Sequence, residues 1–362
     1  MPTYELTQLA AAVVADPDIN CALPTEVEVA KTIGRLKGGK APGLCGITAE
    51  MIKATGEWGV RWLTKVIQTV WNSGEIPPDW RKGIILLFYK GKGSRKECKN
   101  YRGIILLSVP GKVFALVLLN RVKDKLLSTR RCEQSGFTPG RSTVDRISTL
   151  SNIIQTRKEF NTPFWIAYVD LKSAFDSVDS QTSWMLLKSI GLPPKILKLM
   201  EALYTDTCSC VHVNGVTSDW FEVSCGARQG CSIAPDLFVE PMNWIMEYTV
   251  HNGFAGITVK AQVFTDLDYA DDVALLAQML EVLLLSLSVM NEEAKPLGLH
   301  INWSKTKIQQ VGEPRHSCTH VTVAGENVDI LYSFVYLGSL MDRKGGSDPE
   351  IRRRIEIAVE AV

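Results

Sequence analysis

The sequence predicts an α+β fold, and three observations lead to that class. Short apolar runs have the length of strands, and the clearest, FWIAYVDL at residues 164–171, is the kind expected of a strand buried on both faces. Longer segments between such runs repeat apolar residues at helical spacing. The 362 residues are 46% hydrophobic and 22% charged, which suits a globular protein with a sizeable core.

The first part of the chain is predicted to hold three helices and two strands. A weakly patterned extension over residues 1–30 leads into a helix that ends at Gly38 and Gly39, and a second helix spans residues 49–74. IILLFY and GIILL then form two strands around a basic loop of about ten residues. GKVFALVLLNRVKDKLL, at residues 111–127, has the pattern of an amphipathic helix.

After the buried strand at residues 164–171, shorter predicted helices and strands follow one another. Two helices follow the buried strand and break at GLPP, and a hairpin is predicted around Asn214-Gly215 because Asn-Gly suits a two-residue turn. APDLFVEPMNWIMEYTV is predicted to be a helix. Strands are expected on both sides of YADD, then a long apolar helix, then strands within residues 298–311 and 328–342. A final helix is predicted to begin near Asp348, at an Asp-Pro-Glu sequence.

Charge is distributed unevenly along the chain. The formal net charge is only +1, yet residues 81–158 contain 18 lysines and arginines and four acidic residues. A basic block joined to an acidic remainder is typical of a protein that binds a polyanion with one part and metal with another. An uneven solvated surface is the alternative.

Several classes of protein are disfavoured. The nine cysteines form no CxxC pair, which argues against a zinc ribbon or a disulfide framework and favours a reducing, intracellular compartment, nuclear or cytoplasmic. The five histidines show no ligand spacing, and no secretory signal or membrane span is recognised. The pattern does not set the oligomeric state.

The stretch DLDYADDVALL raises the main chemical question. Asp271 and Asp272 are adjacent at the start of an apolar run, and two unit charges about 4 Å apart repel by roughly 4 kcal/mol at an effective dielectric of 20. A divalent cation would offset that repulsion, and Asp170, at the end of another apolar run, could supply a third carboxylate. Because side chains alternate along a strand, Asp271 is the stronger ligand candidate and Asp272 the weaker.

Eight ordered blocks resemble the reverse transcriptases of non-LTR (LINE-type) retrotransposons. VDLKSAFDSVD, ARQGCSIAPDLF, YADD, GLHINWSKTK and FVYLGSL are similar to the family's motifs A to E. LKGGKAPGLCGI, NYRGIILLSVPGKVFALVLLNRV and EQSGFTPGRSTVDRI are similar to its finger segments. The resemblance covers roughly residues 25–355.

The resemblance implies a right-hand polymerase fold with fingers, an antiparallel-sheet palm and a thumb that is largely missing. It places the fingers in residues 31–165, the palm in 166–312 with a finger insertion near 185–225, and the primer grip with the start of the thumb in 313–362. It implies RNA-directed DNA polymerase activity by a two-metal nucleotidyl transfer. The expected partners are an RNA template, a DNA primer and dNTPs, with no membrane.

The same resemblance assigns roles to single residues. Asp170, the carbonyl of Leu171, Asp271 and Asp272 would hold two Mg²⁺ ions, with Mn²⁺ as a substitute. The dNTP would contact Lys90, Arg102, Gln229 and Gly230. Phe175 would be the steric gate that excludes a 2′-hydroxyl. Lys305 would be the acid that protonates the departing pyrophosphate, and Lys307 is the other candidate for this role. Arg141, Tyr269, Tyr336 and Leu337 would contact primer or template.

Each role has a simpler alternative. Phe175 could be a core phenylalanine, Lys90 a solvated loop lysine, and the tyrosines ordinary strand residues. Asp176 and Asp179 are expected to cap or begin a helix, and Asp266 and Asp268 to decorate the turn and strand before YADD.

Two features depart from the family pattern. Leu44-Cys45 stands where the family usually has Pro-Asp, although Pro42, Gly43 and Gly46 can still form the turn. Neither an endonuclease domain nor a cysteine-histidine knuckle is recognised. Polymerisation by this chain alone is therefore left open. The alternatives are a truncated or host-retained copy that only binds nucleic acid, and a maturase-like protein of the group II intron type.

Overall fold

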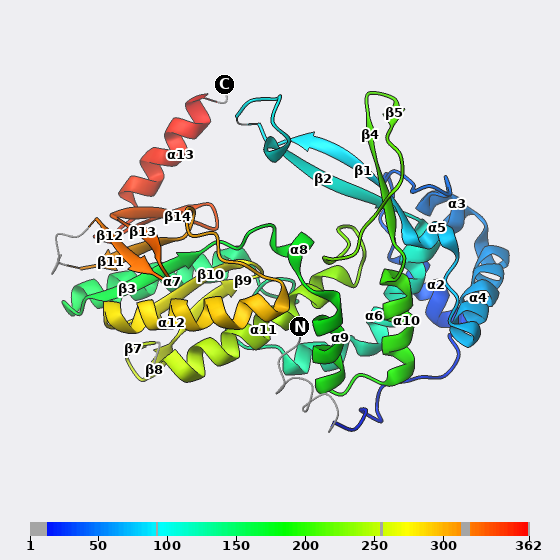
Figure 1. The fold of residues 1–362 in the computed structure, drawn as a ribbon, viewed down its shortest axis with the longest axis horizontal. Coiled ribbons are helices and arrows are strands. Elements are labelled where there is room, and N and C mark those ends of the chain that lie inside the picture. Colours follow the sequence, from blue (N-terminus) through cyan, green and yellow to red (C-terminus); the bar gives the residue numbers. More distant parts are fainter. Residues whose placement is uncertain (1–12, 92, 254–255, 313–318, 361–362) are drawn as a thin grey trace. The chain divides into compact units, whose positions relative to one another are not determined.

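The computed structural model describes residues 13–91, 93–253, 256–312 and 319–360, and the chain divides into two units (Figure 1). The first unit comprises Arg130–Ser177 and Phe238–Val362, and the second comprises Pro2–Thr129 and Val178–Leu237. Helices and strands are mixed in both units, which confirms the predicted α+β class. Among the described residues, no helix combines the length and apolarity that crossing a membrane requires.

A six-stranded sheet forms the centre of the first unit. Its order is β12-β13-β11-β3-β10-β9, and β3 pairs antiparallel with both of its neighbours. All six residues of β3 are buried, as the apolar run predicted. The strands are β3 (Phe164–Val169), β9 (Asp266–Tyr269), β10 (Asp272–Ala277), β11 (Lys307–Val311), β12 (His320–Val323) and β13 (Glu326–Leu331).

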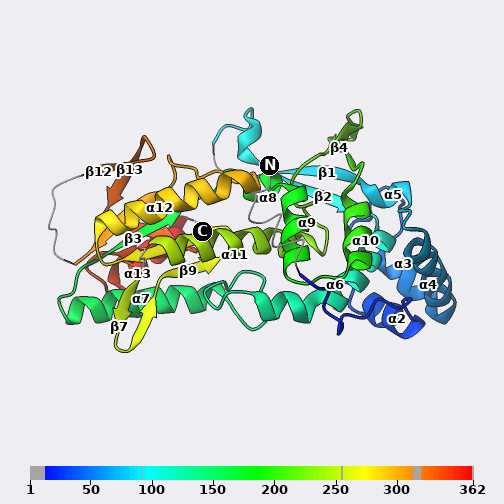
Figure 2. The same ribbon diagram turned by 60° about the horizontal axis from the view of Figure 1, so that its bottom comes forward.

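Two helices lie on opposite sides of these strands, as Figure 2 shows for α7 (Thr143–Glu159) and α12 (Leu280–Ala294). Leu150 and Ile153 of α7 pack in one core cluster with Phe164, Ile166 and Tyr168, which alternate along β3 and therefore share one face. The opposite face of β3 packs against α12. The central strands are thus covered on both faces.

The rest of the first unit consists of short helices, one long helix and two hairpins. The hairpin of β14 (Ser333–Tyr336) and β15 (Ser339–Asp342) turns at Leu337 and Gly338, which both have positive φ, of 49° and 84°. The remaining elements are α8 (Ala174–Ser177), α11 (Ala234–Gly253, of which the part from Phe238 belongs to this unit), β7 (Ile257–Val259), β8 (Gln262–Phe264), η2 (Lys295–Leu297) and α13 (Asp348–Glu360).

The second unit contains a five-stranded sheet in which β1 lies between β2 and β4. The predicted strands IILLFY and GIILL form β1 and β2, which pair antiparallel. The predicted turn at Asn214-Gly215 is also confirmed, because both residues have positive φ and join β4 to β5. The strands are β1 (Lys82–Tyr89), β2 (Tyr101–Leu107), β4 (Cys208–Val213), β5 (Val216–Thr217) and β6 (Phe221–Glu222).

Three helices of the second unit begin at polar caps. Thr25 and Thr48 accept hydrogen bonds from backbone N–H groups in the first turns of α2 and α3, and Asp179 does the same for α9, as predicted. The helices are α2 (Glu26–Gly34), α3 (Ala49–Ala54), α4 (Gly56–Ser73), α5 (Pro78–Arg81), η1 (Cys98–Asn100), α6 (Val109–Thr129), α9 (Ser180–Ser189) and α10 (Pro194–Tyr204).

Several sequence-based boundaries are wrong. The helix predicted over residues 49–74 is two helices, because Gly56 adopts a φ of 57° that interrupts the helical path. The first helix ends at Gly34 rather than at Gly38 and Gly39. Helix α7 and the strands β7, β8 and β12 were not predicted.

Candidate functional site

Two acids face each other at one edge of the six-stranded sheet. Strands β3 and β10 pair with Val169 opposite Val273, so the next residue at this edge is Asp170 on one strand and Asp272 on the other. The end of β3 and the start of β10, about a hundred residues apart in the sequence, therefore lie side by side. The register of one antiparallel pair places these two carboxylates together.

A two-residue turn joins β9 to β10 and carries the third acid. Tyr269 pairs with Asp272, which leaves Ala270 and Asp271 as the turn itself. Ala270 has a φ of 59°, a left-handed conformation that costs an L-residue about 1–2 kcal/mol. This turn interrupts the strand alternation, as the sequence argument required.

The backbone of Asp170 is held by the segment before β11. The Asp170 N–H donates to Thr306 Oγ1 at 3.3 Å, and the Asp170 carbonyl accepts from the Asn302 N–H at 2.7 Å. The next residue, Leu171, is buried and forms an antiparallel bridge with Ile301. The strand end that carries Asp170 is thus fixed from one side.

Burial and the neighbouring acids disfavour the charged form of Asp272. Desolvation, then the negative charges of Asp271 and Asp170, raise its pKa to about 6. A cation would relieve this repulsion, and carboxylate oxygens are suitable ligands for Mg²⁺. No group of three possible ligands is arranged to hold a metal ion within the described residues. Mg²⁺ usually needs only one or two carboxylates, with water and phosphate completing its shell, so these acids fit such an ion.

Of the two candidate lysines, one is directed at the acids. Lys305 Nζ lies 3.3 Å from Asp170 Oδ2, and both side chains are partly exposed. Lys307 Nζ instead lies 2.7 Å from Asp329 Oδ2 and also donates to the Ser304 carbonyl. Of the two lysines, Lys305 is therefore the one whose side chain contacts a candidate metal ligand.

A cavity of about 390 Å³ opens beside the acids. Its wall includes Asp170, Asp272, both lysines and the β14–β15 hairpin residues Tyr336 and Leu337, but not Asp271. The ring of Tyr336 is buried, and its hydroxyl donates to the Leu267 carbonyl at 2.7 Å. Tyr336 thus anchors the hairpin to β9, whereas Leu337 forms the hairpin turn.

Two other primer or template candidates have different surroundings. Tyr269 is half-buried at the end of β9, beside the turn. Arg141 is exposed in the turn before α7, where its N–H donates to the Thr138 carbonyl.

Phe175 belongs to a cluster of three aromatic rings. It is half-buried in α8, stacks on Phe238 at 4.2 Å between centroids and meets Phe137 edge-on at 6.0 Å. The ring is therefore rigidly supported on one side and partly accessible on another. Such a ring can form one wall of a nucleotide site. The same contacts are also those of an ordinary packing phenylalanine.

The second unit brings together the other nucleotide candidates. Arg102 is exposed on β2, and a Cβ on Gly230 would meet the Ile105 carbonyl of the same strand at 2.7 Å. Gly230 also has a φ of 90°, so only glycine fits there. Gln229 is half-buried beside it. Lys90 lies in the exposed loop after β1, where its Nζ donates to the Lys99 carbonyl at 2.8 Å.

Asp266 and Asp268 lie on β9, the strand before YADD, as expected, but they are buried instead of decorating it. Each is 1% exposed, and Arg131 contacts both: its guanidinium lies 2.8 Å from Asp266 Oδ1 and 3.3 Å from Asp268 Oδ2. Burial, then the neighbouring Asp266, raise the pKa of Asp268 well above its usual value. These acids form an internal ion cluster behind the turn, and no local pattern reveals Arg131 as their partner, because it lies 135 positions from Asp266.

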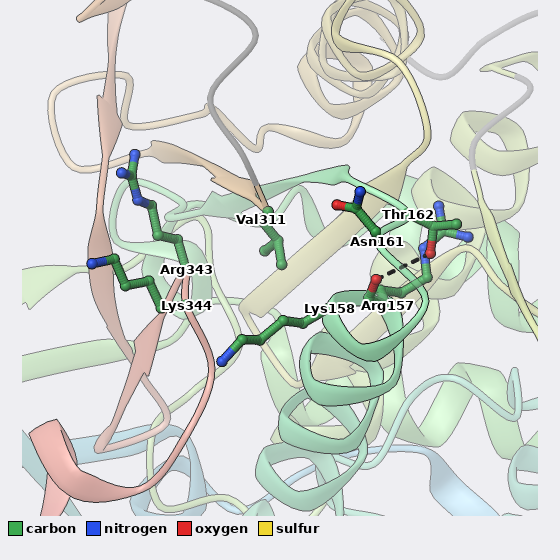
Figure 3. A pocket seen from close by; sticks show the side chains of 8 residues that line it. Arg157, Lys158, Asn161, Thr162, Val311, Arg343 and Lys344 are labelled. Carbon is green, nitrogen blue, oxygen red and sulfur yellow. Dashed lines mark hydrogen bonds between the residues drawn. The ribbon is translucent and has the colours of Figure 1, made fainter.

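A second cavity, of about 380 Å³, has lysines and arginines in its wall (Figure 3). It lies beyond the start of β3, at the end remote from Asp170, and its wall includes Arg157, Lys158, Arg343 and Lys344. Figure 3 shows that these four side chains point in different directions. Arg157 donates to the carbonyls of Thr258 and Pro163, and Arg343 lies over the Tyr332 ring at 4.1 Å. Both arginines are therefore engaged in packing the fold.

Comparison with known proteins identifies a matching family model. Residues 90–338 match the model described as reverse transcriptase (RNA-dependent DNA polymerase). This match contains the sheet edge with its three acids, the β14–β15 hairpin as far as its turn, and the strand that carries Arg102.

Similar proteins come from transposable elements of animals. The chain is 25% identical to the transposon TX1 uncharacterized 149 kDa protein of Xenopus laevis over 77% of its length, and 23% identical to the RNA-directed DNA polymerase from mobile element jockey of Drosophila melanogaster over 88%. It is 26% identical over 90% to the putative 115 kDa protein in type-1 retrotransposable element R1DM, also of Drosophila melanogaster. The chain spans 21%, 35% and 32% of these relatives, respectively.

Proposed function

The chain belongs to the reverse transcriptase (RNA-dependent DNA polymerase) family, and from this we propose that it is the polymerase part of a non-LTR retrotransposon protein. Its reaction joins a dNTP to the 3′-hydroxyl of a primer under the direction of an RNA template, with release of pyrophosphate. The family model and the relatives named as RNA-directed DNA polymerases support the proposal.

The observation that carries the proposal is the convergence of Asp170, Asp271 and Asp272 at one edge of the sheet. Desolvation and repulsion among these acids raise the pKa of Asp272 to about 6, so the sheet edge is prepared for a cation. Phosphoryl transfer needs little covalent help from a protein and depends on charge stabilisation and alignment. A concentrated set of acids without a protein nucleophile matches that requirement.

We propose that Asp170, the Leu171 carbonyl, Asp271 and Asp272 hold two Mg²⁺ ions, for which Mn²⁺ can substitute. The ions would supply charge neutralisation for the attacking hydroxyl and for the leaving pyrophosphate. Lys305, which lies 3.3 Å from Asp170, would protonate the pyrophosphate as it departs.

The remaining roles concern binding. We propose that Phe175 excludes a 2′-hydroxyl, that Arg102 and Lys90 contact the triphosphate, and that Gln229 and Gly230 lie along the nucleotide. Arg102 suits phosphate because its guanidinium donates in a planar fork. The primer or template would contact Leu337, Tyr269 and Arg141. Tyr336 would hold the β14–β15 hairpin in place through its hydrogen bond to Leu267 of β9.

In the proposed right-hand fold, residues 31–165 serve as fingers and 166–312 as palm, with a finger insertion near 185–225. Residues 313–362 serve as primer grip and as the start of the thumb.

Primer extension tests the proposal. The purified chain is given an RNA template, a DNA primer, dNTPs and Mg²⁺, beside the Asp271→Asn variant. We expect extension by the parent protein alone. A folded parent protein that binds the RNA–DNA hybrid without extending it would instead establish a nucleic-acid-binding protein without polymerase activity.

A pH prediction follows from Asp272. Because its pKa is about 6 in the folded protein and 3.8 for an ordinary aspartate, the metal-free protein loses stability from this group as the pH rises from 3.8 through 6. Asp272→Asn should therefore raise metal-free stability at pH 7 by about 1 kcal/mol, a value reduced by solvent screening of an exposed carboxylate. Thermal unfolding at pH 5 and pH 7 measures the difference between variant and parent.

Mg²⁺ provides the control for this prediction. It should stabilise the parent more at pH 7 than at pH 5, because a proton on Asp272 competes with the ion. The variant should show a smaller pH dependence. Equal Mg²⁺ stabilisation of the parent at both pH values would contradict the account of Asp272.

A further inference from the structure

The turn that carries Asp271 is strained at the residue before it. Ala270 has a φ of 59° at a position where the first residue of a two-residue hairpin turn is commonly glycine. A non-glycine residue keeps such a conformation only when its surroundings hold it. Ala270 is 4% exposed, so protein groups rather than water must satisfy its peptide atoms.

The Gln134 side chain forms hydrogen bonds with both peptide groups of Ala270. Gln134 Oε1 accepts from the Ala270 N–H at 2.7 Å, and Gln134 Nε2 donates to the Ala270 carbonyl at 3.3 Å. Gln134 is 2% exposed, and its Oε1 also accepts from the Gly136 N–H at 2.7 Å. Two N–H donors on the same atom fix which end of the amide is oxygen. The amide therefore holds the peptide groups on both sides of Ala270, including the one that leads to Asp271.

The segment that carries Gln134 is itself fixed against the turn. It runs along β9, where the Asp268 N–H donates to the Glu133 carbonyl and the Ser135 N–H donates to the Asp268 carbonyl. A Cβ on Gly136 would lie 2.2 Å from the Ala270 nitrogen, so this residue must be glycine for the segment to approach so closely.

Buried arginines anchor the same segment from behind. Arg146 donates to Ser135 Oγ at 2.6 Å and to the Cys132 carbonyl at 2.9 Å. Arg131, three residues before Gln134, contacts Asp266 and Asp268 of β9. Residues 131–136 are thus tied to both β9 and α7, and Gln134 projects from a rigid support.

We infer that Gln134 is a positioning residue that holds the Ala270 turn, and with it the Asp271 carboxylate, in the arrangement needed for nucleotide transfer. The inference rests on the proposed function. Without the amide, the Ala270–Asp271 peptide can rotate towards a relaxed φ, which moves the carboxylate away from Asp170. Asp271 then takes part in catalysis only in the fraction of molecules that retain the strained turn.

The test compares Gln134→Met with the parent. Methionine keeps the length of the side chain and removes its donors and acceptor. We expect the single-turnover rate of dNTP incorporation to fall about 10- to 100-fold, as misplacement of a reacting group does. The dissociation constants for primer–template and dNTP should change less than about twofold, because Gln134 does not line the cavity beside the acids.

Two further variants separate positioning from simple packing. Gln134→Met combined with Ala270→Gly should recover most of the rate, because glycine adopts a positive φ without support. Gln68→Met is the matched control: the Gln68 amide donates to the Pro24 carbonyl at 2.8 Å in the second unit. It should lower the melting temperature without changing the rate.

Amide hydrogen exchange makes the test independent of activity. The Ala270 N–H should exchange at least about tenfold faster in Gln134→Met, because its acceptor is gone. Unchanged exchange overturns the inference even if the parent protein does not polymerise. In an active parent, a normal incorporation rate for Gln134→Met, or no recovery with Ala270→Gly, also overturns it. Failure of the parent to extend a primer overturns the proposed function alone.

Discussion

Asp170→Asn is expected to reduce the rate of nucleotide incorporation by about 10³-fold or more while the protein remains folded. Removing one group that stabilises transition-state charge typically costs about 10²- to 10³-fold, and Asp170 would serve both metal ions. Its carboxylate forms only a partly exposed ion pair with Lys305, and such pairs contribute little stability. Single-turnover incorporation and thermal unfolding measure the two effects.

Asp266→Asn is the matched control for that variant. Asp266 is buried against Arg131 at 2.8 Å. Replacing its carboxylate should cost about 1.5–3 kcal/mol, because a hydrogen-bonded charge pair is lost and Arg131 keeps only the longer contacts to Asp268 and Glu133. We therefore expect a large loss of stability from Asp266→Asn and a large loss of rate from Asp170→Asn. If the two variants lost stability equally, the division between metal acids and structural acids would be wrong.

Phe175→Val is expected to reduce discrimination against ribonucleotides by about 100-fold, the scale on which a hydrophobic wall distinguishes small groups. A smaller side chain leaves room for the 2′-hydroxyl that the ring would exclude. The measurement is the ratio of incorporation efficiency for a dNTP and for the matching NTP, in an active parent and in the variant.

Phe238→Val distinguishes a gate from a packing residue. Phe238 is fully buried and stacks on Phe175 at 4.2 Å. Its truncation should lower stability by about 2–3 kcal/mol and leave nucleotide discrimination largely intact. If both variants destabilise the protein and neither changes discrimination, Phe175 is a core phenylalanine.

The elements around the acids were predictable because their signals are local. An apolar run that ends at Asp170 and another that begins at Asp272 are each typical of a buried strand. A turn at YADD was expected because strands were predicted on both sides of it. Asn214-Gly215 carried the same kind of local information for the β4–β5 hairpin. In each case, neighbouring residues indicate the element, although the strained conformation of Ala270 also depends on the distant Gln134.

The supports behind the turn were not predictable, since they depend on pairings far apart in the chain. Arg131 and Asp266 lie 135 positions apart in the sequence, and Gln134 and Ala270 lie 136 positions apart. The sequence pattern placed Asp266 and Asp268 in the turn and strand before YADD, and it could not show that Arg131 pairs with them inside the fold. Helix α7 was missed because polar and β-branched residues in TVDRISTLSNIIQTRKE weaken its helical pattern.

The most direct measurement of the central claim is single-nucleotide incorporation by the purified chain on an RNA template, with Mg²⁺, beside Asp170→Asn. The account predicts that the parent extends the primer by the complementary dNTP, that extension stops when Mg²⁺ is chelated, and that the variant binds the same primer–template without extending it. A parent that binds primer–template and Mg²⁺ but adds no nucleotide, or a variant that extends as fast as the parent, would contradict it.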